Sequence, residues 1–393
     1  MKVALICKAL NTELGGIQTH TRYLAMSLAK QGAEVHILTA GSWKGRSHWQ
    51  LKGVKIHPLR YFPGYRLNGL RRLADDLAFN LYANRWLKAH QHEFDLLHVQ
   101  GRSGVLFAAK GRLKVPVIQT FHGLTREEYW HTHHKSGFNL DGWLHQLLFH
   151  RWETTAFHRA TGVITVSEFM KEQLEENLGS PSLPVKVISN GVRVEPLEPN
   201  INRTRHLTFL GRIEENKGIR WLPDILASLP SHIHLRIIGT GKRTSALRNA
   251  FLEKKLLHRV DWVGPLPNPM VMPLLEKSLA LLIPSIYEPQ GLVALEAFER
   301  GVPVIASRTG GLKELVLHKE NGWLVEPGDV NKIVEYVNRL DQDPTTSRRM
   351  GQMGRDMVQN HYQWHHIASQ TLAFYNETLQ QVAPHEVIPQ RQE

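Results

Sequence analysis

Two glutamates in the last third of the chain, Glu288 and Glu296, have seven residues between them. Residues 280–283 are a short apolar run typical of a buried strand, Pro284 ends it, and helix-forming composition starts at Leu292. We expect a strand, a loop with Glu288, and a helix with Glu296 about one turn inside. Carboxylates accept hydrogen bonds from hydroxyl groups, and free N–H groups at a helix start suit phosphate. A phosphate-bearing, hydroxyl-rich ligand would fit here, whereas a solvated loop and a surface helix explain the residues without any ligand.

A second turn of similar type follows. Residues 301–306 have the composition of another strand, and they lead through Thr309, Gly310 and Gly311 into a new helix start. A Gly-Gly turn at a helix start can bind phosphate. The whole stretch resembles the signature of the retaining, nucleotide-sugar-dependent glycosyltransferases of family 4, which have the GT-B fold. The paired glutamates, the Gly-Val-Pro-Val-Ile run and the Gly-Gly turn match that signature in order.

The resemblance implies a role for each matched residue. Glu288 would hold hydroxyl groups of the donor sugar, and Glu296 would hold the ribose. The amides of the helix start, at Gly291, Leu292 and Val293, would face the phosphates.

Two cations stand at the start of the second half. Residues 207–210 are typical of a strand, Gly211-Arg212 follows, and Lys217 lies on the loop before the next helix. Exposed loop cations are common, but the resemblance implies that Arg212 and Lys217 clamp the donor diphosphate. A metal would then be unnecessary for charge neutralisation. By the same resemblance, three further positions lie near the nucleotide: Gly239, Gly264 and Leu266.

The first half contains a glycine pair and a histidine at the ends of predicted strands. Gly15-Gly16 follows the first apolar run, and His122 follows the strand at 115–121. An isolated Gly-Gly turn and a lone histidine are more often structural than functional. Ligands nevertheless bind at the carboxyl ends of parallel strands. The resemblance implies that Gly15 and Gly16 face the donor phosphate and the acceptor, and that His122 lies beside the transferred sugar.

A cluster of histidines at His131, His133 and His134 is a candidate metal site. His133 and His134 are adjacent and point in different directions, and no cysteine or carboxylate spacing supports them. We expect no metal there, and we assign the cluster to a loop on the acceptor side.

The length of 393 residues predicts two domains of ~190 residues each. Alternating strand and helix patterns predict an α/β protein with two Rossmann-like doubly wound domains that face each other across a cleft. We place the N-terminal acceptor domain at 1–190, a linker at 191–204 and the donor domain at 205–363. The resemblance implies that a helix at about 364–381 packs back on the first domain. We expect a disordered tail at 384–393.

The formal net charge of +12 is concentrated in the N-terminal half. Residues 1–190 hold 24 Lys or Arg and 14 Asp or Glu, whereas residues 191–393 hold 24 and 22. A basic half favours an anionic partner, such as a lipid surface. Basic and aromatic residues interleave in one segment, which suits a membrane interface as well as it suits a solvated loop: Arg60, Tyr61, Phe62, Tyr65, Arg66, Arg71 and Arg72.

From these features we expect a metal-independent, retaining transferase that moves a sugar from a nucleotide, UDP rather than GDP or ADP, to a glycan or lipid-linked sugar. The resemblance places it in the assembly of bacterial surface polysaccharide, lipopolysaccharide or glycolipid. A single cysteine and no apolar run of ~20 residues predict a cytoplasmic protein, peripheral on the inner face of the membrane.

Three alternatives remain open. A UDP-sugar epimerase can share this architecture, and a transferase with a small soluble acceptor would also have a basic pocket. A nucleic-acid-binding protein would explain the charge, but no known binding module accompanies it, so we expect no nucleic-acid partner. The sequence does not predict the oligomeric state.

Overall fold

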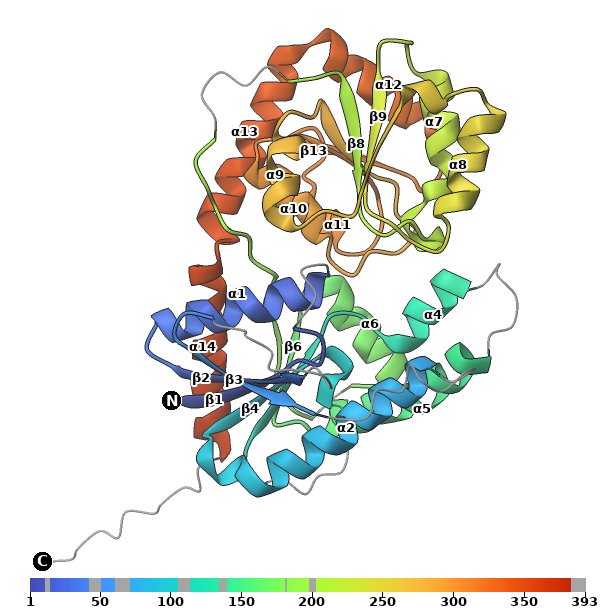
Figure 1. The fold of residues 1–393 in the computed structure, drawn as a ribbon. Coiled ribbons are helices and arrows are strands. Elements are labelled where there is room, and N and C mark those ends of the chain that lie inside the picture. The colour runs from blue at the N-terminus through green and yellow to red at the C-terminus, as the bar shows by residue number, and fades with distance from the viewer. Residues whose placement is uncertain are drawn as a thin grey trace, which may run out of the picture.

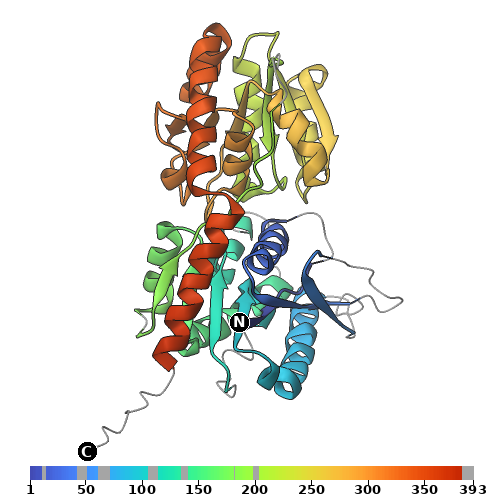
Figure 2. The ribbon, with the colours of Figure 1, turned by 90° about the vertical axis from the view of Figure 1, so that its left-hand side faces the viewer.

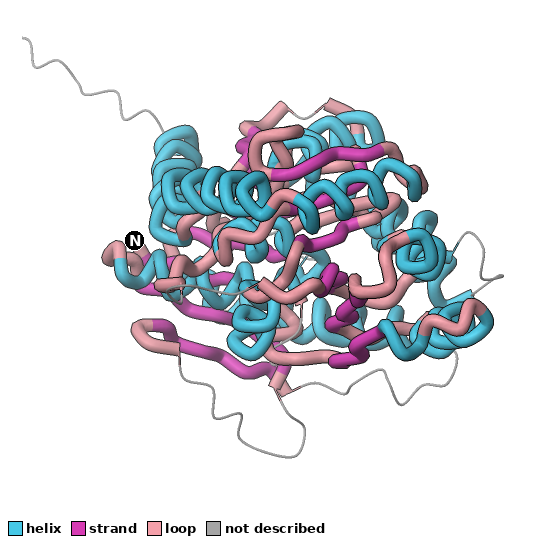
Figure 3. Tube along the Cα trace, turned by 90° about the horizontal axis from the view of Figure 1, so that it is seen from above, coloured by secondary structure: helices cyan, strands magenta, loops and turns pink. Residues whose placement is uncertain are grey.

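The computed structural model describes residues 1–10, 15–41, 51–60, 71–104, 114–133, 140–180, 182–197 and 203–382. Within these ranges the chain forms two parallel sheets with helices on either side of each (Figures 1 and 3). The expected fold class, two Rossmann-like doubly wound domains, is confirmed.

The first sheet has seven described strands in the order β3-β2-β1-β4-β5-β6-β7. Its strands are β1 (Lys2–Ile6), β2 (Glu34–Ala40), β3 (Val54–Leu59), β4 (Leu96–Gln100), β5 (Val117–Phe121), β6 (Gly162–Thr165) and β7 (Val185–Val187). Its helices are α1 (Gly16–Lys30), α2 (Arg71–His90), α4 (Thr125–His133), α5 (Leu140–Arg159) and α6 (Glu168–Leu178), with short 3-10 helices η2 (Gln91–Glu93) and η3 (Gly101–Gly104).

The second sheet has six described strands in the order β10-β9-β8-β11-β12-β13. Its strands are β8 (His206–Leu210), β9 (His234–Ile238), β10 (Val260–Gly264), β11 (Ala280–Ile283), β12 (Val304–Ser307) and β13 (Gly322–Val325). Its helices are α7 (Leu222–Ser228), α8 (Thr244–Glu253), α9 (Asn268–Glu276), α10 (Leu292–Glu299), α11 (Leu312–Leu315), α12 (Val330–Gln342) and α13 (Pro344–His361), with 3-10 helices η4 (Glu215–Lys217), η5 (Ile219–Trp221) and η6 (Leu257–Arg259).

Both sheets reverse their strand order at one point, between β1 and β4 in the first and between β8 and β11 in the second. The strands on each side of these points are short, mostly apolar and largely buried, as is typical of parallel sheets, and β4 also buries His98 and Gln100. Crevices form at such reversals, outside the carboxyl ends of the strands, and ligands bind in them. The loops after β8 and β11 carry Lys217 and Glu288, so the topology alone places both residues at one crevice.

The last described helix, α14 (Trp364–Val382), belongs by packing to the first domain although it ends the described chain (Figures 1 and 2). It lies along α1, and Trp364, Ile367, Phe374 and Tyr375 are part of the core around β1 and β2. A Cβ on Gly162 would lie 2.9 Å from the Phe374 ring, so the helix and β6 are in close contact.

Several sequence predictions fall outside the described residues. They concern residues 61–70 of the basic aromatic segment, the side chains of Arg71 and Arg72, part of the linker, and the tail at 384–393. In the described part of the chain, no helix has the length and apolar character needed to cross a bilayer.

Candidate active site

Glu288 lies on the loop between β11 and α10 and forms an ion pair with Lys217 of η4. The distance from Lys217 Nζ to Glu288 Oε2 is 2.7 Å, and Ser285 Oγ donates to the same oxygen at 3.2 Å. Only 18% of the Lys217 side chain and 12% of the Glu288 side chain are exposed. Two of the predicted site residues are therefore in direct contact.

Glycines allow the loops of this site to touch. Gly310 has a φ of +53°, and a Cβ on it would lie 1.9 Å from the carbonyl oxygen of Glu288. A Cβ on Gly239, which has a φ of +135°, would lie 1.9 Å from the carbonyl oxygen of Gly211. Only glycine fits either position. The predicted Gly-Gly turn thus supports the Glu288 loop, and Gly239 supports the strand end that carries Arg212.

Arg212 reaches across the cleft to the first domain. Its Nη2 lies 3.7 Å from Glu128 Oε1 on α4, and 58% of its side chain is exposed. The two predicted cations therefore have different counter-ions, because Lys217 is paired within its own domain. An exposed ion pair contributes ~1 kcal/mol or less, so a more strongly bound anion can replace Glu128.

Glu296 lies half-buried on α10 and accepts a hydrogen bond of 2.7 Å from Asn268 Nδ2. Burial raises the pKa of Glu296 to about 7, and the hydrogen bond from Asn268 opposes that shift. A large share of Glu296 is therefore uncharged at neutral pH.

The helix start beside Glu288 has the backbone expected for an anion site. Gly291, at a φ of 102°, caps α10, and Leu292 and Val293 are its first two residues. The first N–H groups of a helix have no intrahelical partner. Gly264, at a φ of 79°, ends β10 and accepts a hydrogen bond of 2.8 Å from Gly239 N, and Leu266 follows it half-buried.

His122 follows β5 in the first domain. Its Nε2 lies 2.8 Å from Gln100 Oε1, and its ring centre lies 4.7 Å from that of His20 in an edge-to-face arrangement. Burial lowers the pKa of His122 far below its ordinary value, and nearby His20 and His98 lower it further. Burial also lowers the pKa of His20 to about 4, against a hydrogen bond to Asn190. Both rings are neutral at physiological pH.

The two halves of the site meet at the donor loop. A Cβ on Gly123, the residue after His122, would lie 3.6 Å from Pro289 Cγ, and one on Gly16 would lie 3.9 Å from Leu292 Cδ2. Gly15, at a φ of 135°, caps the same helix start, α1. The glycine pair and the histidine predicted in the first domain thus lie beside the predicted donor residues of the second.

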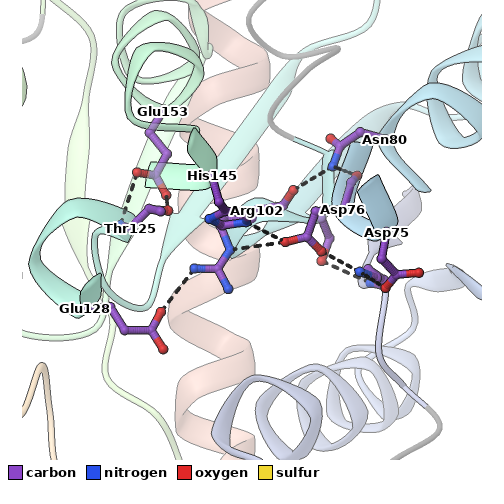
Figure 4. A network of polar contacts seen from close by, with 10 residues as sticks. Asp75, Asp76, Asn80, Arg102, Thr125, Glu128, His145 and Glu153 are labelled. Atoms are coloured by element: carbon purple, nitrogen blue, oxygen red, sulfur yellow. Dashed lines mark hydrogen bonds and ion pairs between the residues drawn. The ribbon is translucent and has the colours of Figure 1, made fainter. Parts of the chain in front are cut away.

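Beside this contact the first domain holds a network of charged side chains centred on Asp76 of α2 (Figure 4). Lys8 Nζ lies 2.5 Å from both Asp75 Oδ2 and Asp76 Oδ1, and His145 Nε2 lies 2.9 Å from Asp76 Oδ2. Burial alone would raise the pKa of Asp76. The hydrogen bond from His145 and the charges of Lys8 and Arg102 outweigh burial and lower that pKa well below its usual range.

The network continues to the cleft through Arg102 of η3. Arg102 Nη1 donates to Glu128 Oε2 at 3.1 Å, and the other oxygen of Glu128 faces Arg212. Glu153, nearby on α5, accepts from Thr125 Oγ1 at 2.5 Å and from Thr125 N at 3.2 Å. Burial raises the pKa of Glu153 to about 7 against these hydrogen bonds. Charged groups thus connect Lys8, just after the first strand, to Arg212.

A second contact between the domains lies at the start of α6. Ser167 caps this helix by accepting from Met170 N, and it donates to Pro289 O at 2.6 Å. The carboxylate of Glu314 on α11 accepts from the backbone N–H groups of Glu168 and Phe169 at 3.0 and 2.9 Å. The Glu288 loop and the turn that supports it are therefore both attached to the first domain.

Several residues of the site escaped prediction. Glu128 and Asn268 have no motif around them, and only the folded chain brings them to the cleft. Glu314 follows the predicted Gly310-Gly311 turn, but no local pattern predicts its contact with α6. The sequence pattern could have identified Gln100, because it is a polar residue at the end of a predicted strand and is followed by glycine.

Known structures of the same fold are glycosyltransferases. Sucrose-phosphate synthase from Thermosynechococcus elongatus matches with a TM-score of 0.81 at 22% identity, over 97% of this chain and 99% of that one. Anabaena HepE in complex with UDP-glucose matches with a TM-score of 0.75 at 19% identity, over 97% and 100%. The fold is that of the GT-B glycosyltransferases.

The family follows from the sequence comparisons. Residues 14–196 match the model described as Glycosyltransferase Family 4, and residues 198–357 match Glycosyl transferases group 1. An uncharacterized glycosyltransferase of Methanocaldococcus jannaschii is 26% identical over 407 residues, which cover 97% of this chain and 99% of the relative. The chain belongs to the glycosyltransferases of family 4 and group 1.

Proposed function

We propose that the protein is a retaining hexosyltransferase that moves a sugar from UDP to a hydroxyl group of a membrane-linked glycan, without a metal. The bond between the sugar's anomeric carbon and the diphosphate breaks, and a bond to the acceptor oxygen forms on the same face. The acceptor proton passes to the leaving diphosphate. The observation that carries this proposal is the Lys217–Glu288 ion pair at the crevice, with Arg212 beside it at an exchangeable contact.

Each group has a role in that reaction. Arg212 and Lys217 would stabilise the charge that develops on the leaving diphosphate, together with the amides that open α10. Glu288, released from Lys217, would bind hydroxyl groups of the sugar, and Glu296 would bind the ribose. UDP as the carrier is supported by the solved complex of HepE, a protein of the same fold, with UDP-glucose.

The clamp is tested by UDP binding to Arg212→Ala and Lys217→Ala variants. Each change should weaken binding by at least ~1.5 kcal/mol, about tenfold, which is the scale of a charge-assisted hydrogen bond. Titration calorimetry with UDP gives the dissociation constants, and turnover of the two variants with UDP-sugars should fall in parallel. Turnover of the unchanged protein should persist in EDTA. Arg248→Ala, an exposed cation on α8, is the matched control. Unchanged binding in both clamp variants would overturn the assignment.

The membrane-linked acceptor rests on the charge of the first domain and on exposed apolar side chains there. Residues 1–190 carry a net +10, and their helices expose Leu81 and Tyr82 on α2, Trp130 on α4, and Leu140, Trp143 and Leu147 on α5. Helices α2 and α5 pack against each other (Figure 1). Leu140, Trp143 and Leu147 share one face of α5 by helical spacing. Aromatic and apolar groups near basic ones are typical of surfaces that lie on anionic lipid.

Vesicle binding tests this docking. We expect cosedimentation with anionic vesicles of phosphatidylglycerol, release at ~0.5 M salt, and weaker binding when Arg66, Arg71 and Arg72 are changed to Glu. Leu147→Ala should also weaken binding, whereas Leu252→Ala, an equally apolar exposed site on α8 of the other domain, should not. A protein that ignores anionic vesicles at low salt would have a soluble acceptor instead.

A further inference from the structure

Behind His122 a row of buried polar side chains runs back to the last helix. His122 Nε2 contacts Gln100 Oε1 at 2.8 Å, Gln100 Nε2 contacts His98 Nε2 at 3.1 Å, and His98 Nδ1 contacts the Tyr375 hydroxyl at 2.6 Å. Gln100, His98 and Tyr375 are fully buried. Burying three polar groups in a sheet core costs free energy unless each is hydrogen-bonded, so their arrangement has little freedom.

The direction of each hydrogen bond fixes the next. The oxygen of the Gln100 amide only accepts, so His122 Nε2 must carry its proton. The nitrogen of the Gln100 amide only donates, so His98 Nε2 has no proton and accepts through its lone pair. Thr120 Oγ1 donates to the same atom at 2.6 Å. His98 then carries its proton on Nδ1 and donates to Tyr375.

A neutral imidazole has one proton, so His122 has its lone pair on Nδ1. Within the described part of the chain, His122 Nε2 has a hydrogen-bond partner and His122 Nδ1 has none. Protein atoms do not fully enclose Nδ1. His122 is also only partly buried and lies next to Gly123, which faces Pro289 of the donor loop. Nδ1 is therefore left for a ligand in the cleft.

We propose that Gln100 is a positioning residue that holds His122 as the Nε2–H tautomer, with His98 and Tyr375 fixing the Gln100 amide. His122 Nδ1 then accepts a hydrogen bond from a hydroxyl group of the sugar in the cleft and does not donate one. The identity of this ligand as a sugar rests on the proposed function, whereas the tautomer of His122 does not. The row also gives the last helix, α14, a part in the site, because Tyr375 is the end of the row.

The tautomer is tested without substrate. The protein with ¹⁵N-labelled histidine is studied by NMR at neutral pH, and the His122 signals are assigned by their loss in His122→Asn. We expect one pyrrole-type nitrogen at Nε2 and one pyridine-type nitrogen at Nδ1. A protonated Nδ1 would overturn the proposal, whatever the protein's activity.

Two matched variants separate positioning from a merely structural role. Gln100→Met should give mixed His122 tautomers and lower kcat about fivefold to tenfold, the scale of one lost hydrogen bond, with UDP affinity unchanged. Tyr375→Phe should have a smaller effect in the same direction. Gln119→Met is the control, because Gln119 is also fully buried but, within the described residues, donates only to the backbone oxygens of Gly101 and Thr120. Equal kcat in Gln100→Met and Gln119→Met would overturn the proposal, whereas absence of transfer in the unchanged protein would refute the proposed function alone.

Discussion

The two sides of the cleft use charge in different ways. On the donor side, within the described part of the chain, Arg212 and Lys217 each pair with one carboxylate, and glycines and helix starts provide the remaining contacts. On the acceptor side Lys8, Asp76 and Arg102 each have several partners, and His98 and His122 are held neutral. The charges of the first domain hold its strand ends in place, whereas the proposed function assigns Arg212 and Lys217 to a diphosphate.

The largest effect that tests this contrast is on stability, at Asp76. Asp76→Ala leaves Lys8 and Arg102 partly buried with fewer counter-charges, and removing one partner of a buried pair costs ~3–5 kcal/mol. We expect the urea midpoint of the first domain to fall accordingly. Since the pKa of Asp76 is lowered by folding, its contribution is present above the unfolded value near 4 and disappears as the pH falls further.

A donor-side change provides the comparison for that experiment. Arg212→Ala removes an exposed pair whose other member, Glu128, keeps its contact with Arg102, so the free energy of unfolding should stay within ~1 kcal/mol of the unchanged protein while UDP binding weakens. If Arg212→Ala destabilised the protein as much as Asp76→Ala, the distinction between the two sides would be wrong.

The sequence predicted the local structure around Glu288 and Lys217 well because its information is local. Strand ends, Gly-Gly turns and helix starts are written in adjacent residues, so the loop of Glu288 and the position of Lys217 could be placed from spacing and resemblance. Contact between Lys217 and Glu288 followed from the strand order, which brings β8 and β11 together.

The acceptor side was predicted poorly because its information is distant. Asp76, Arg102 and His145 come from three elements with no shared motif, and they meet only in the folded domain. Glu128 faces Arg212 from the other domain, which no local pattern specifies. The charge excess of the first half indicated a basic surface, yet much of that charge near the cleft is neutralised by these carboxylates.

A smaller effect separates the two donor glutamates. Glu296→Gln should weaken binding of free UDP, whereas Glu288→Gln should leave UDP binding intact and lower kcat with the full UDP-sugar, since only Glu288 would contact the sugar. The two variants exchange carboxylate for amide without a change of size. The opposite result would mean that the two roles are reversed.

Glu296 also predicts a pH dependence. Because burial raises its pKa to about 7, the carboxyl group is mostly neutral at pH 6 and mostly charged at pH 8. The charged form accepts stronger hydrogen bonds from ribose hydroxyls, so UDP affinity should rise across this range. Glu296→Gln corrects for ionisation of UDP itself, and the same rise in that variant would exclude Glu296 as its source.

The smallest expected effect tests whether the two sides are coupled. Glu314 accepts from two N–H groups at the start of α6, and a carboxylate at a helix N-terminus contributes ~0.3–1 kcal/mol. Glu314→Ala should therefore speed hydrogen exchange of the Glu168 and Phe169 amides severalfold with little loss of global stability. Glu320→Ala, an exposed neighbour after the same helix, should not.

The same variant should alter the reaction in one particular way. Glu314 follows the Gly310–Gly311 turn that supports the Glu288 loop, and Pro289 of that loop accepts a hydrogen bond from Ser167 of the acceptor domain. Losing the Glu314 contact therefore weakens the packing of the Glu288 loop against the first domain, while Lys217 and Arg212 keep their positions. UDP binding should stay unchanged, and kcat should fall about twofold to fivefold, in proportion to the lost contact. If UDP binding fell and kcat did not, Glu314 would belong to the donor site alone, and the domains would meet at this helix without functional coupling.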